Sequence, residues 1–345
     1  MYMKTKIIAT IGPKTESEKD LNRLLDEGVD MVRVNFSHAS YEQYERVKKI
    51  VDNYNKKNKK DVKMIADLQG PRIRIGILPE EGLNLIDGQV FQFVYKKNEI
   101  YEDGIIPINN SDLYLDIKIG EPLFLSNGEI ELKVNNIDGI KGIIRATVIR
   151  GGLLTSRKGI NVPHTNLKRG GLTPKDVKDV EFVLKAGVDY IALSFVQTKA
   201  DVQKLRSLIN NESVKLISKI ERAIALENID EIVKASDMIM IARGDLGIEI
   251  PIQELPIIQK YLVKFAHWHA KPAIIATQIM TSMIKNPHPT RAEVSDIANA
   301  VIDGGDIVML SDETAVGDYS SEAINILKKV ITRTERYLVN DDIII

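Results

Sequence analysis

The stretch KLISKIERAIALENIDEIVKASDMIMIA, residues 215–242, contains the unit that decides the fold. It holds two short apolar runs, Lys215–Ile220 and Met238–Ala242, with a segment of mixed polar and apolar residues between them. Near-continuous apolar runs of this length are typical of parallel strands that are covered on both faces. The stretch therefore predicts a strand, a helical crossing and a second parallel strand.

The same unit recurs along the whole chain. The further apolar runs are Thr5–Ile11, Met31–Asn35, Lys63–Leu68, Tyr190–Ser194, Ala273–Thr277 and Ile307–Leu310. Eight strand–helix units in one chain predict an α/β protein with a closed (β/α)8 barrel. The alternative is an open doubly wound sheet, which usually has a glycine-rich first turn. No G-x-G-x-x-G follows Ile11, so the barrel is preferred.

Helical patterns with recognisable ends lie between these runs. Ser17 precedes an apolar stripe that Gly28 closes, and Thr173-Pro174 opens another helix with proline at its first position. The further stripes run through Val202–Ile209, Ile257–Ala270, Ala292–Ile302 and Ala323–Leu338. The alternation of strands and helices supports the barrel.

One connection is unusually long, because the next clear helix after the third strand starts only at Thr173. The turn dipeptides in this stretch are Asp87-Gly88, Asp103-Gly104, Asn127-Gly128 and Asp138-Gly139. The strand-like pieces around them are Val90–Tyr95, Leu123–Leu125, Glu129–Val134 and Ile143–Ile149. This pattern predicts β-hairpins. We expect residues 76–163 to form a small β-barrel-like domain that acts as a lid, and residues 1–75 and 164–345 to form the catalytic barrel.

Composition excludes several classes of protein. Of the 345 residues, 44% are hydrophobic and 28% are charged, which is typical of a globular chain. Lysine and arginine (47) nearly balance aspartate and glutamate (48), so neither nucleic acid nor a membrane is an expected partner. The absence of cysteine excludes disulfides and thiolate metal sites. No run is long enough to span a bilayer and no cleavage signal follows the start, so we expect a cytoplasmic protein.

Polar residues gather where the predicted strands end, which is where (β/α)8 barrels carry their chemistry. Glu221 and Asp245 follow neighbouring strands. Each could be only an acid at a helix start or a helix cap. Together they suit Mg²⁺, which accepts two carboxylates and completes its shell with water and substrate oxygens.

Cations accompany these carboxylates. Lys219 lies two residues before Glu221, so both side chains point to the same face of the strand. It could be a salt-bridge partner of Glu221 or Asp245, or it could stabilise charge on a phosphoryl group or an enolate. Three arginines, Arg33, Arg72 and Arg74, also fall at this end and favour an anionic, phosphorylated ligand.

Seven motifs in these positions resemble those of the pyruvate kinase family, in the family's order and over nearly the whole chain. They are Asn35-Phe36-Ser37-His38, Asp67-Leu68-Gln69-Gly70-Pro71-Arg72-Ile73-Arg74, Lys158-Gly159-Ile160-Asn161-Val162-Pro163, Ser218-Lys219-Ile220-Glu221, Ala242-Arg243-Gly244-Asp245-Leu246-Gly247, Ala276-Thr277-Gln278 and Pro289-Thr290-Arg291-Ala292-Glu293. The resemblance implies a barrel with a β lid after its third strand. It also implies reversible phosphoryl transfer between phosphoenolpyruvate and ADP, giving pyruvate and ATP in glycolysis.

The resemblance also implies roles for the residues that match its motifs. Glu221 and Asp245 would hold Mg²⁺ (or Mn²⁺). Lys219 and Arg33 would bind and stabilise the transferring phosphoryl group, and Thr277 would assist proton delivery to the enolate carbon. The backbone N–H groups of Gly244 and Asp245 would bind the substrate carboxylate. The residues that would face the nucleotide are Asn35, His38, Arg74 and Lys158.

The chain departs from the family at the monovalent-cation site. Potassium-dependent members usually read D-T-K-G-P-E-I-R, where this chain has Leu68, Gln69 and Arg72. A fixed guanidinium at Arg72 can supply the charge that K⁺ would otherwise provide. The residues that still match the K⁺ site are Asn35, Ser37, Asp67 and the carbonyl of Leu68. We expect activity that does not require K⁺.

The family normally continues into a C-terminal regulatory domain, which we expect to be absent because this chain ends at Ile345. Residues 341–345 would be a frayed tail or a strand that pairs elsewhere. A homo-oligomer, most simply a dimer through barrel contacts, is expected. Two other functions stay open: a metal-dependent aldolase or lyase acting on pyruvate enolates, and an inactive subunit that serves in binding or assembly.

Overall fold

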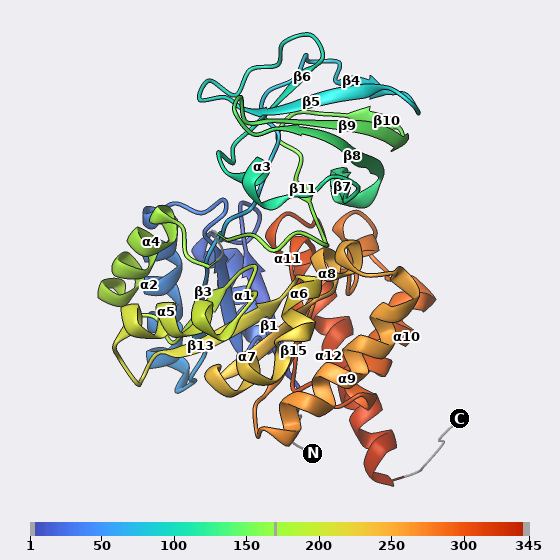
Figure 1. The fold of residues 1–345 in the computed structure, drawn as a ribbon. Coiled ribbons are helices and arrows are strands. Elements are labelled where there is room, and N and C mark those ends of the chain that lie inside the picture. Colours follow the sequence, from blue (N-terminus) through green and yellow to red (C-terminus); the bar gives the residue numbers. More distant parts are fainter. Residues whose placement is uncertain (1–3, 169–170, 341–345) are drawn as a thin grey trace.

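The computed structural model describes residues 4–168 and 171–340, and its largest element is a closed barrel of eight parallel strands (Figure 1). Around the barrel the strand order is β1-β16-β15-β14-β13-β12-β3-β2. The bounds are β1 (Lys6–Ile11), β2 (Met31–Asn35), β3 (Lys63–Asp67), β12 (Tyr190–Leu193), β13 (Lys215–Ile220), β14 (Met238–Ala242), β15 (Ala273–Ala276) and β16 (Ile307–Leu310). The predicted (β/α)8 barrel is confirmed.

Helices cover the outside of the barrel (Figure 1). They are α1 (Glu18–Glu27), α2 (Tyr41–Asn58), α4 (Pro174–Ala186), α5 (Lys199–Ile209), α6 (Ala223–Glu227), α7 (Ile229–Ala235), α8 (Arg243–Glu249), α9 (Leu255–Trp268), α10 (Arg291–Ile302), α11 (Asp312–Ala315) and α12 (Ser320–Asn340). The predicted ends of α1 and α4 have the expected chemistry. The Ser17 hydroxyl accepts the Asp20 N–H, Gly28 takes a left-handed φ of 109°, and Thr173 forms a capping box with Asp176.

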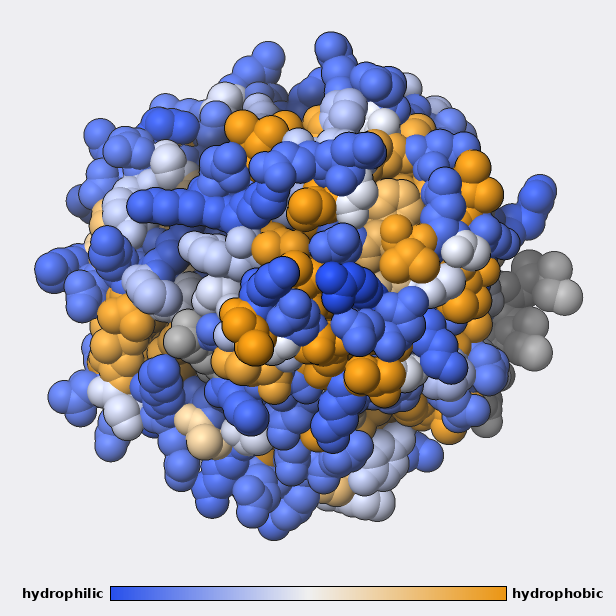
Figure 2. Space-filling view, turned by 45° about the horizontal axis from the view of Figure 1, so that its top comes forward, coloured by the Kyte–Doolittle hydropathy of each residue, from blue (hydrophilic) through white to orange (hydrophobic). Residues whose placement is uncertain are grey.

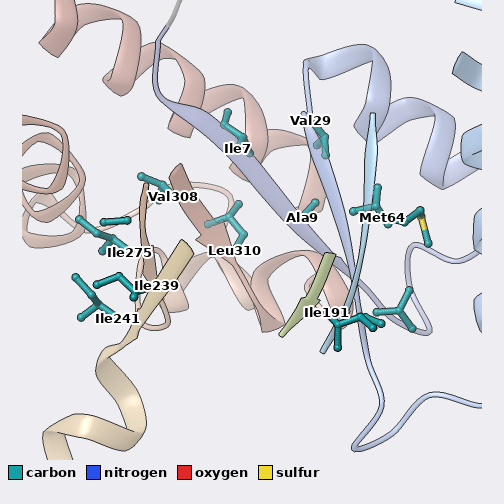
Figure 3. Close-up of a cluster of buried hydrophobic side chains, with 14 of the residues drawn as sticks. Ile7, Ala9, Val29, Met64, Ile191, Ile239, Ile241, Ile275, Val308 and Leu310 are labelled. Atoms are coloured by element: carbon teal, nitrogen blue, oxygen red, sulfur yellow. The ribbon is translucent and has the colours of Figure 1, made fainter. Parts of the chain in front are cut away.

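Alternation along the strands builds two hydrophobic layers. Side chains such as Ile7, Ala9, Ile239 and Ile241 point outward and pack in a fully buried layer against the helices (Figure 3). The intervening residues point into the barrel, as Met240 does between Ile239 and Ile241. Because both faces of each strand are buried, the strands read as continuous apolar runs.

The insert, residues 76–163, forms two further sheets over the end of the barrel that lies away from the N-terminus (Figure 1). Their orders are β11-β7-β8-β9-β5-β6 and β10-β4. The bounds are β4 (Leu83–Leu85), β5 (Val90–Tyr95), β6 (Ile105–Ile108), α3 (Leu113–Asp116), β7 (Pro122–Leu125), β8 (Ile130–Asp138), β9 (Ile143–Arg150), β10 (Gly152–Leu154) and β11 (Ile160–Asn161). Buried side chains such as Phe93, Leu132 and Ile144 form its own hydrophobic cluster.

One of the four predicted hairpin turns is wrong. Asn127-Gly128 and Asp138-Gly139 do join antiparallel neighbours, β7 with β8 and β8 with β9. Asp87-Gly88 follows β4, which pairs with β10 instead of β5. Asp103-Gly104 joins Glu102 and Ile105 in an antiparallel bridge, although the strands β5 and β6 pair in parallel. Both glycines have positive φ, 84° and 72°, so the turns are real. A turn residue fixes the local bend but does not select the partner strand.

Figure 2 shows the face of the molecule that carries the insert. This face is mainly hydrophilic, and its hydrophobic side chains form small groups among the hydrophilic ones. Within residues 4–168 and 171–340, the helices are all too short or too polar to cross a membrane. The tail 341–345, for which two conformations were expected, lies outside the described residues.

The start of α10 offers a test of local stability. The Glu293 carboxylate accepts the N–H groups of Thr290 (2.7 Å) and Ser282 (2.8 Å). Burial alone would raise the pKa of Glu293, but the hydrogen bonds from Ser282 and Thr290 outweigh it and lower the pKa below 4.5. We expect Glu293→Ala to lower the free energy of unfolding by about 1 kcal/mol at neutral pH, as for loss of a helix cap.

The pH dependence has a definite sign. Because the folded-state pKa is depressed, the contribution of Glu293 is fully present above 4.5 and is lost as the pH falls through the folded pKa. The stability gap between wild type and Glu293→Ala, measured by urea unfolding, should therefore shrink below about pH 4.5. Glu322→Ala, which removes an exposed ion pair with Arg23, is the control. An equal gap at all pH values would contradict the assignment.

Candidate active site

A cavity opens at the carboxyl ends of the barrel strands, beneath the insert. Its lining comes from most of the barrel: Arg33, Asn35, Ser37, Gln69, Arg72, Ser194, Phe195, Lys219, Glu221, Met240, Ala242, Asp245, Thr277 and Met309. The cavity therefore brings together the predicted catalytic and metal-binding residues and, apart from Gly244, the predicted substrate-binding residues.

Lys219 lies at the centre of the polar network. Its Nζ lies 2.9 Å from Glu221 Oε1, 2.8 Å from Ser194 Oγ and 3.2 Å from Asp67 Oδ1. Burial alone would lower the pKa of Lys219, but the carboxylates of Asp67 and Glu221 outweigh it and raise the pKa. The lysine is therefore a charged ammonium that lines the cavity, and the predicted salt bridge with Glu221 is present.

Arg33 is buried, unlike a solvated surface arginine. Its Nε donates to Asp67 Oδ2 at 2.6 Å and its Nη1 donates to Thr10 Oγ at 2.9 Å. Burial alone would raise the pKa of Asp67, yet Lys219 and Arg33 together lower it. Asp67 therefore stays ionised and fixes two cations, Arg33 and Lys219, beside each other at the cavity wall.

Glu221 and Asp245 are not helix caps. Ala242 occupies the N-cap of α8 and Arg222 that of α6, whereas both acids line the cavity. Glu221 Oε2 accepts the Phe195 N–H at 2.7 Å. Burial raises the pKa of Glu221, and the charge of Asp245 raises it further against the opposing effect of Lys219. Two carboxylates thus face one cavity with unfavourable mutual charge.

The donor set fits a divalent cation that needs few protein ligands. Among the described residues, no group of three or more histidines, aspartates or glutamates is arranged to hold a metal. Mg²⁺ is usually bound by one or two carboxylates plus water and substrate oxygens, which matches Glu221 and Asp245. The cavity is lined by three cationic residues (Arg33, Arg72, Lys219) and two acids, with Asp67 directly behind them. These six charges cancel, so a bound divalent cation would make the site positive.

Thr277 adopts a left-handed conformation with φ of 68°, which is rare for a β-branched residue. Its Oγ accepts the Gly244 N–H at 2.7 Å and donates to the Ala276 carbonyl at 2.6 Å. The N–H expected to bind a substrate carboxylate is therefore donated to Thr277 in this structure. Thr277, Gly244 and Asp245 nevertheless lie together at one wall of the site.

The predicted nucleotide residues are more dispersed. Asn35 lines the cavity and its Oδ1 accepts the Ser37 N–H at 3.0 Å, while His38, Arg74 and Lys158 are not among the residues that line it. Burial, followed by the charges of Arg74 and Arg72, lowers the pKa of His38. Lys158 is exposed, and its carbonyl accepts the Ile75 N–H at 2.9 Å, where the chain enters and leaves the insert.

Two groups that match the K⁺ site, the Asp67 carboxylate and the Leu68 carbonyl, already have protein partners. Asp67 pairs with Arg33 and Lys219, and the Leu68 carbonyl accepts the Ser194 hydroxyl at 2.7 Å. Arg72 Nη2 lies 3.6 Å from Asp245 Oδ1. The guanidinium thus lies beside one carboxylate of the acidic pair.

Three residues near the site were not assigned from the sequence. Ser194 holds both Lys219 and the Leu68 carbonyl, and Arg243 contacts the backbone of Thr277. Asp312 acts electrostatically on His38 and raises its pKa against the larger lowering effects of burial and nearby arginines. Ser194, Arg243 and Asp312 all stand at or just after strand ends. Their position at strand ends could therefore have marked them as site residues, but their contacts could not be read from the sequence.

The chain was compared with known proteins. Residues 2–324 match the family model described as "Pyruvate kinase, barrel domain". The chain is 44% identical to a pyruvate kinase of Thermotoga maritima, covering 97% of this chain and 72% of that protein. It is 40% identical to pyruvate kinases of Geobacillus stearothermophilus (100% and 59%) and Thermococcus litoralis (97% and 70%). The chain belongs to the pyruvate kinase family, and it is a phosphotransferase enzyme.

Proposed function

We propose that this site transfers the phosphoryl group of phosphoenolpyruvate to ADP, giving pyruvate and ATP. The observation that carries the proposal is the convergence of Lys219, Glu221 and Asp245 on one cavity with Arg33. An aldolase or lyase is not favoured, because the relatives that match nearly the whole chain are pyruvate kinases. Lys219, Glu221, Asp245 and Arg33 all carry the charged groups that phosphoryl transfer needs, which argues against an inactive subunit.

In the proposed reaction, the bond between phosphorus and the enol oxygen breaks while a β-phosphate oxygen of ADP bonds to the phosphorus. The transition state is loose and highly anionic, so positioned positive charge provides most of the catalysis. Lys219 and Arg33 supply that charge from side chains that Asp67 holds in place. Because these cations are already oriented, little reorganisation is needed during the reaction.

The enolate left behind takes a proton at its methylene carbon to become pyruvate. Thr277 is proposed to assist that delivery, and the N–H groups of Gly244 and Asp245 to bind the carboxylate at the start of α8. Carboxylate binding would take over the Gly244 N–H that Thr277 now accepts. The exchange would free an acceptor lone pair of the Thr277 oxygen, while its hydrogen is donated to the Ala276 carbonyl.

Glu221 and Asp245 are proposed to hold Mg²⁺, or Mn²⁺ in its place. The ion would supply Lewis-acid stabilisation of negative charge on substrate oxygens. The insert is proposed to act as a lid that excludes water, which would otherwise capture the phosphoryl group. Asn35, His38, Arg74 and Lys158 are proposed to bind the nucleotide. Action in the cytoplasm and assembly into a homo-oligomer remain predictions from the sequence.

The test is ATP formation from phosphoenolpyruvate and ADP by the purified chain with Mg²⁺. Aldol cleavage of 4-hydroxy-2-oxo acids is assayed in parallel. We expect ATP formation to depend on all three components. Aldol cleavage without ATP formation would replace the proposal by the lyase function, and neither activity would favour the binding subunit.

We further propose that Arg72 replaces K⁺, so that activity does not require a monovalent cation. The proposal is supported by the guanidinium at 3.6 Å from Asp245 and by the protein donors already bound to Asp67 and Leu68. We expect Arg72→Glu to make activity depend on K⁺, with turnover in its absence about 100-fold lower, as for loss of one stabilising charge.

Activity is measured with the tetramethylammonium salts of all components, with and without added KCl. Arg157→Glu, which changes an exposed arginine of the insert, is the matched control and should stay independent of K⁺. A steep K⁺ requirement in the unmodified chain would contradict the replacement.

A further inference from the structure

The turn that follows β15 is strained at two successive positions. Thr277 and Gln278 have φ values of 68° and 53°, in the left-handed region that non-glycine residues rarely adopt. For Thr277 the strain is larger, because its branched Cβ crowds the backbone there. Such a conformation persists only when the surrounding structure holds it, and it is concentrated at functional sites.

Arg243 is the side chain that holds this turn. Ala242 and Ala276 are register partners on neighbouring strands, so Arg243 and Thr277 are the next residues along each strand. The Arg243 guanidinium reaches across and donates to the Thr277 carbonyl from Nη2 (2.9 Å) and Nε (3.3 Å). It also donates to the Gln278 carbonyl from Nη2 (3.0 Å). Both strained peptide units are therefore bound by one planar group.

The guanidinium is itself fixed from behind. Its Nη1 lies 2.7 Å from Asp296 Oδ2 on α10 and 3.3 Å from Gln259 Oε1 on α9. The Arg243 side chain is only 8% exposed, so these hydrogen bonds form away from water. A buried charged donor with a carboxylate partner makes strong, directional hydrogen bonds. The outer helices thus orient the arginine, and the arginine orients the turn.

We propose that Arg243 is a positioning residue that acts through Thr277. By holding the left-handed turn, it keeps the Thr277 hydroxyl beside the Gly244 N–H, at the wall shared with Asp245. The inference rests on the proposed function, in which Thr277 assists protonation of the enolate. Arg243 itself is not among the residues that line the cavity. Its effect should fall on proton transfer at the methyl carbon of pyruvate more than on substrate binding.

The test is a double-mutant cycle of Arg243→Met and Thr277→Val. Two quantities are measured: kcat and KM for phosphoenolpyruvate, and the exchange of pyruvate methyl protons with D₂O followed by NMR in the presence of Mg²⁺ and ATP. We expect Thr277→Val to slow exchange by about 100-fold, the lower range for general acid–base catalysis. Arg243→Met should slow exchange by about 10-fold or more, with KM changed less than about threefold. In the Thr277→Val background, Arg243→Met should add no further loss.

Independent effects that multiply in the double variant would overturn the proposal. Arg206→Met is the matched control, because Arg206 also pairs with an aspartate, Asp237, and a backbone carbonyl, that of Ala235, but at the other end of the barrel. It should exchange pyruvate protons at the wild-type rate. If Arg243→Met does not fold, Arg243→Lys replaces it in the cycle, since an ammonium keeps the charge without the fork of donors.

A crystal structure of the Arg243 variant gives a readout that does not depend on activity. We expect residues 277 and 278 to leave the left-handed region when the guanidinium is removed. Retention of both positive φ values would overturn the proposal. Absence of ATP formation by the unmodified chain would instead refute the proposed function, and the two failures are therefore distinguishable.

Discussion

The Lys219→Met variant is expected to fold and to lose about 10³-fold to 10⁵-fold of kcat, the range that one cation contributes in phosphoryl transfer. The Lys219 ammonium lies within 3.2 Å of Ser194, Glu221 and Asp67, so its position is fixed before substrate binds. Methionine has a similar length but no charge. The loss should therefore appear mainly in kcat, because the charge on the phosphoryl group and enolate grows in the transition state.

Lys219→Met also removes a cation that contacts two buried carboxylates, those of Asp67 and Glu221. We therefore expect a lower melting temperature in the absence of Mg²⁺ and partial recovery when Mg²⁺ is added. Lys215→Met is the matched control, because Lys215 lies at the opposite, exposed end of the same strand β13. It should retain wild-type turnover in the coupled ATP assay. Near-wild-type turnover in folded Lys219→Met would refute the role of Lys219.

The barrel was predictable from the sequence because burial on both faces leaves a strong local signal. All eight strands begin and end within one residue of their predicted bounds, and the helices with marked caps, α1 and α4, were also found. The insert was less predictable. Strands β4 and β10 have three residues each and pair across the whole length of the insert, so no local pattern indicates their partner.

The site shows a similar division. Lys219, Glu221 and Asp245 could be brought together from strand alternation and the order of strands in a parallel barrel. The role of Ser194 could not, because a serine at a strand end gives no sign of which lysine or carbonyl it will contact. The strain at Thr277 and Gln278 is likewise invisible in the sequence, since neither residue is typical of a left-handed turn.

The charge balance of the cavity connects the metal to the substrate. Three cations and three carboxylates cancel, so the protein alone offers an anionic ligand no net attraction. Burial and the charge of Asp245 raise the pKa of Glu221 despite the opposing effect of Lys219, so the two carboxylates repel each other at the cavity. A divalent cation would relieve that repulsion and leave the lysine and arginines free to bind phosphate. Metal binding should therefore precede tight binding of phosphoenolpyruvate.

Asp245→Asn is expected to weaken Mg²⁺ binding by about 100-fold or more, beyond the 10- to 100-fold loss typical of a residue that only supports a metal ligand. Asp245 is a cleaner choice than Glu221, which also holds Lys219 and the Phe195 N–H. Asparagine keeps the shape and one carbonyl oxygen, so the main change is the loss of one negative charge. The start of α8 should stay intact.

The measurement is direct titration of Mn²⁺, as a spectroscopic stand-in for Mg²⁺, by electron paramagnetic resonance without substrates. Asp312→Asn is the control, because Asp312 is an exposed carboxylate that follows another barrel strand, β16, at the same end of the barrel. It should bind Mn²⁺ as the unmodified chain does. In Asp245→Asn, saturating Mg²⁺ should restore part of the turnover, since Lys219 and Arg33 are unchanged. Unaltered Mn²⁺ affinity in this variant would mean that the acidic pair does not hold the metal. The proposal that Glu221 and Asp245 bind the metal while Lys219 stabilises the phosphoryl group would then be wrong.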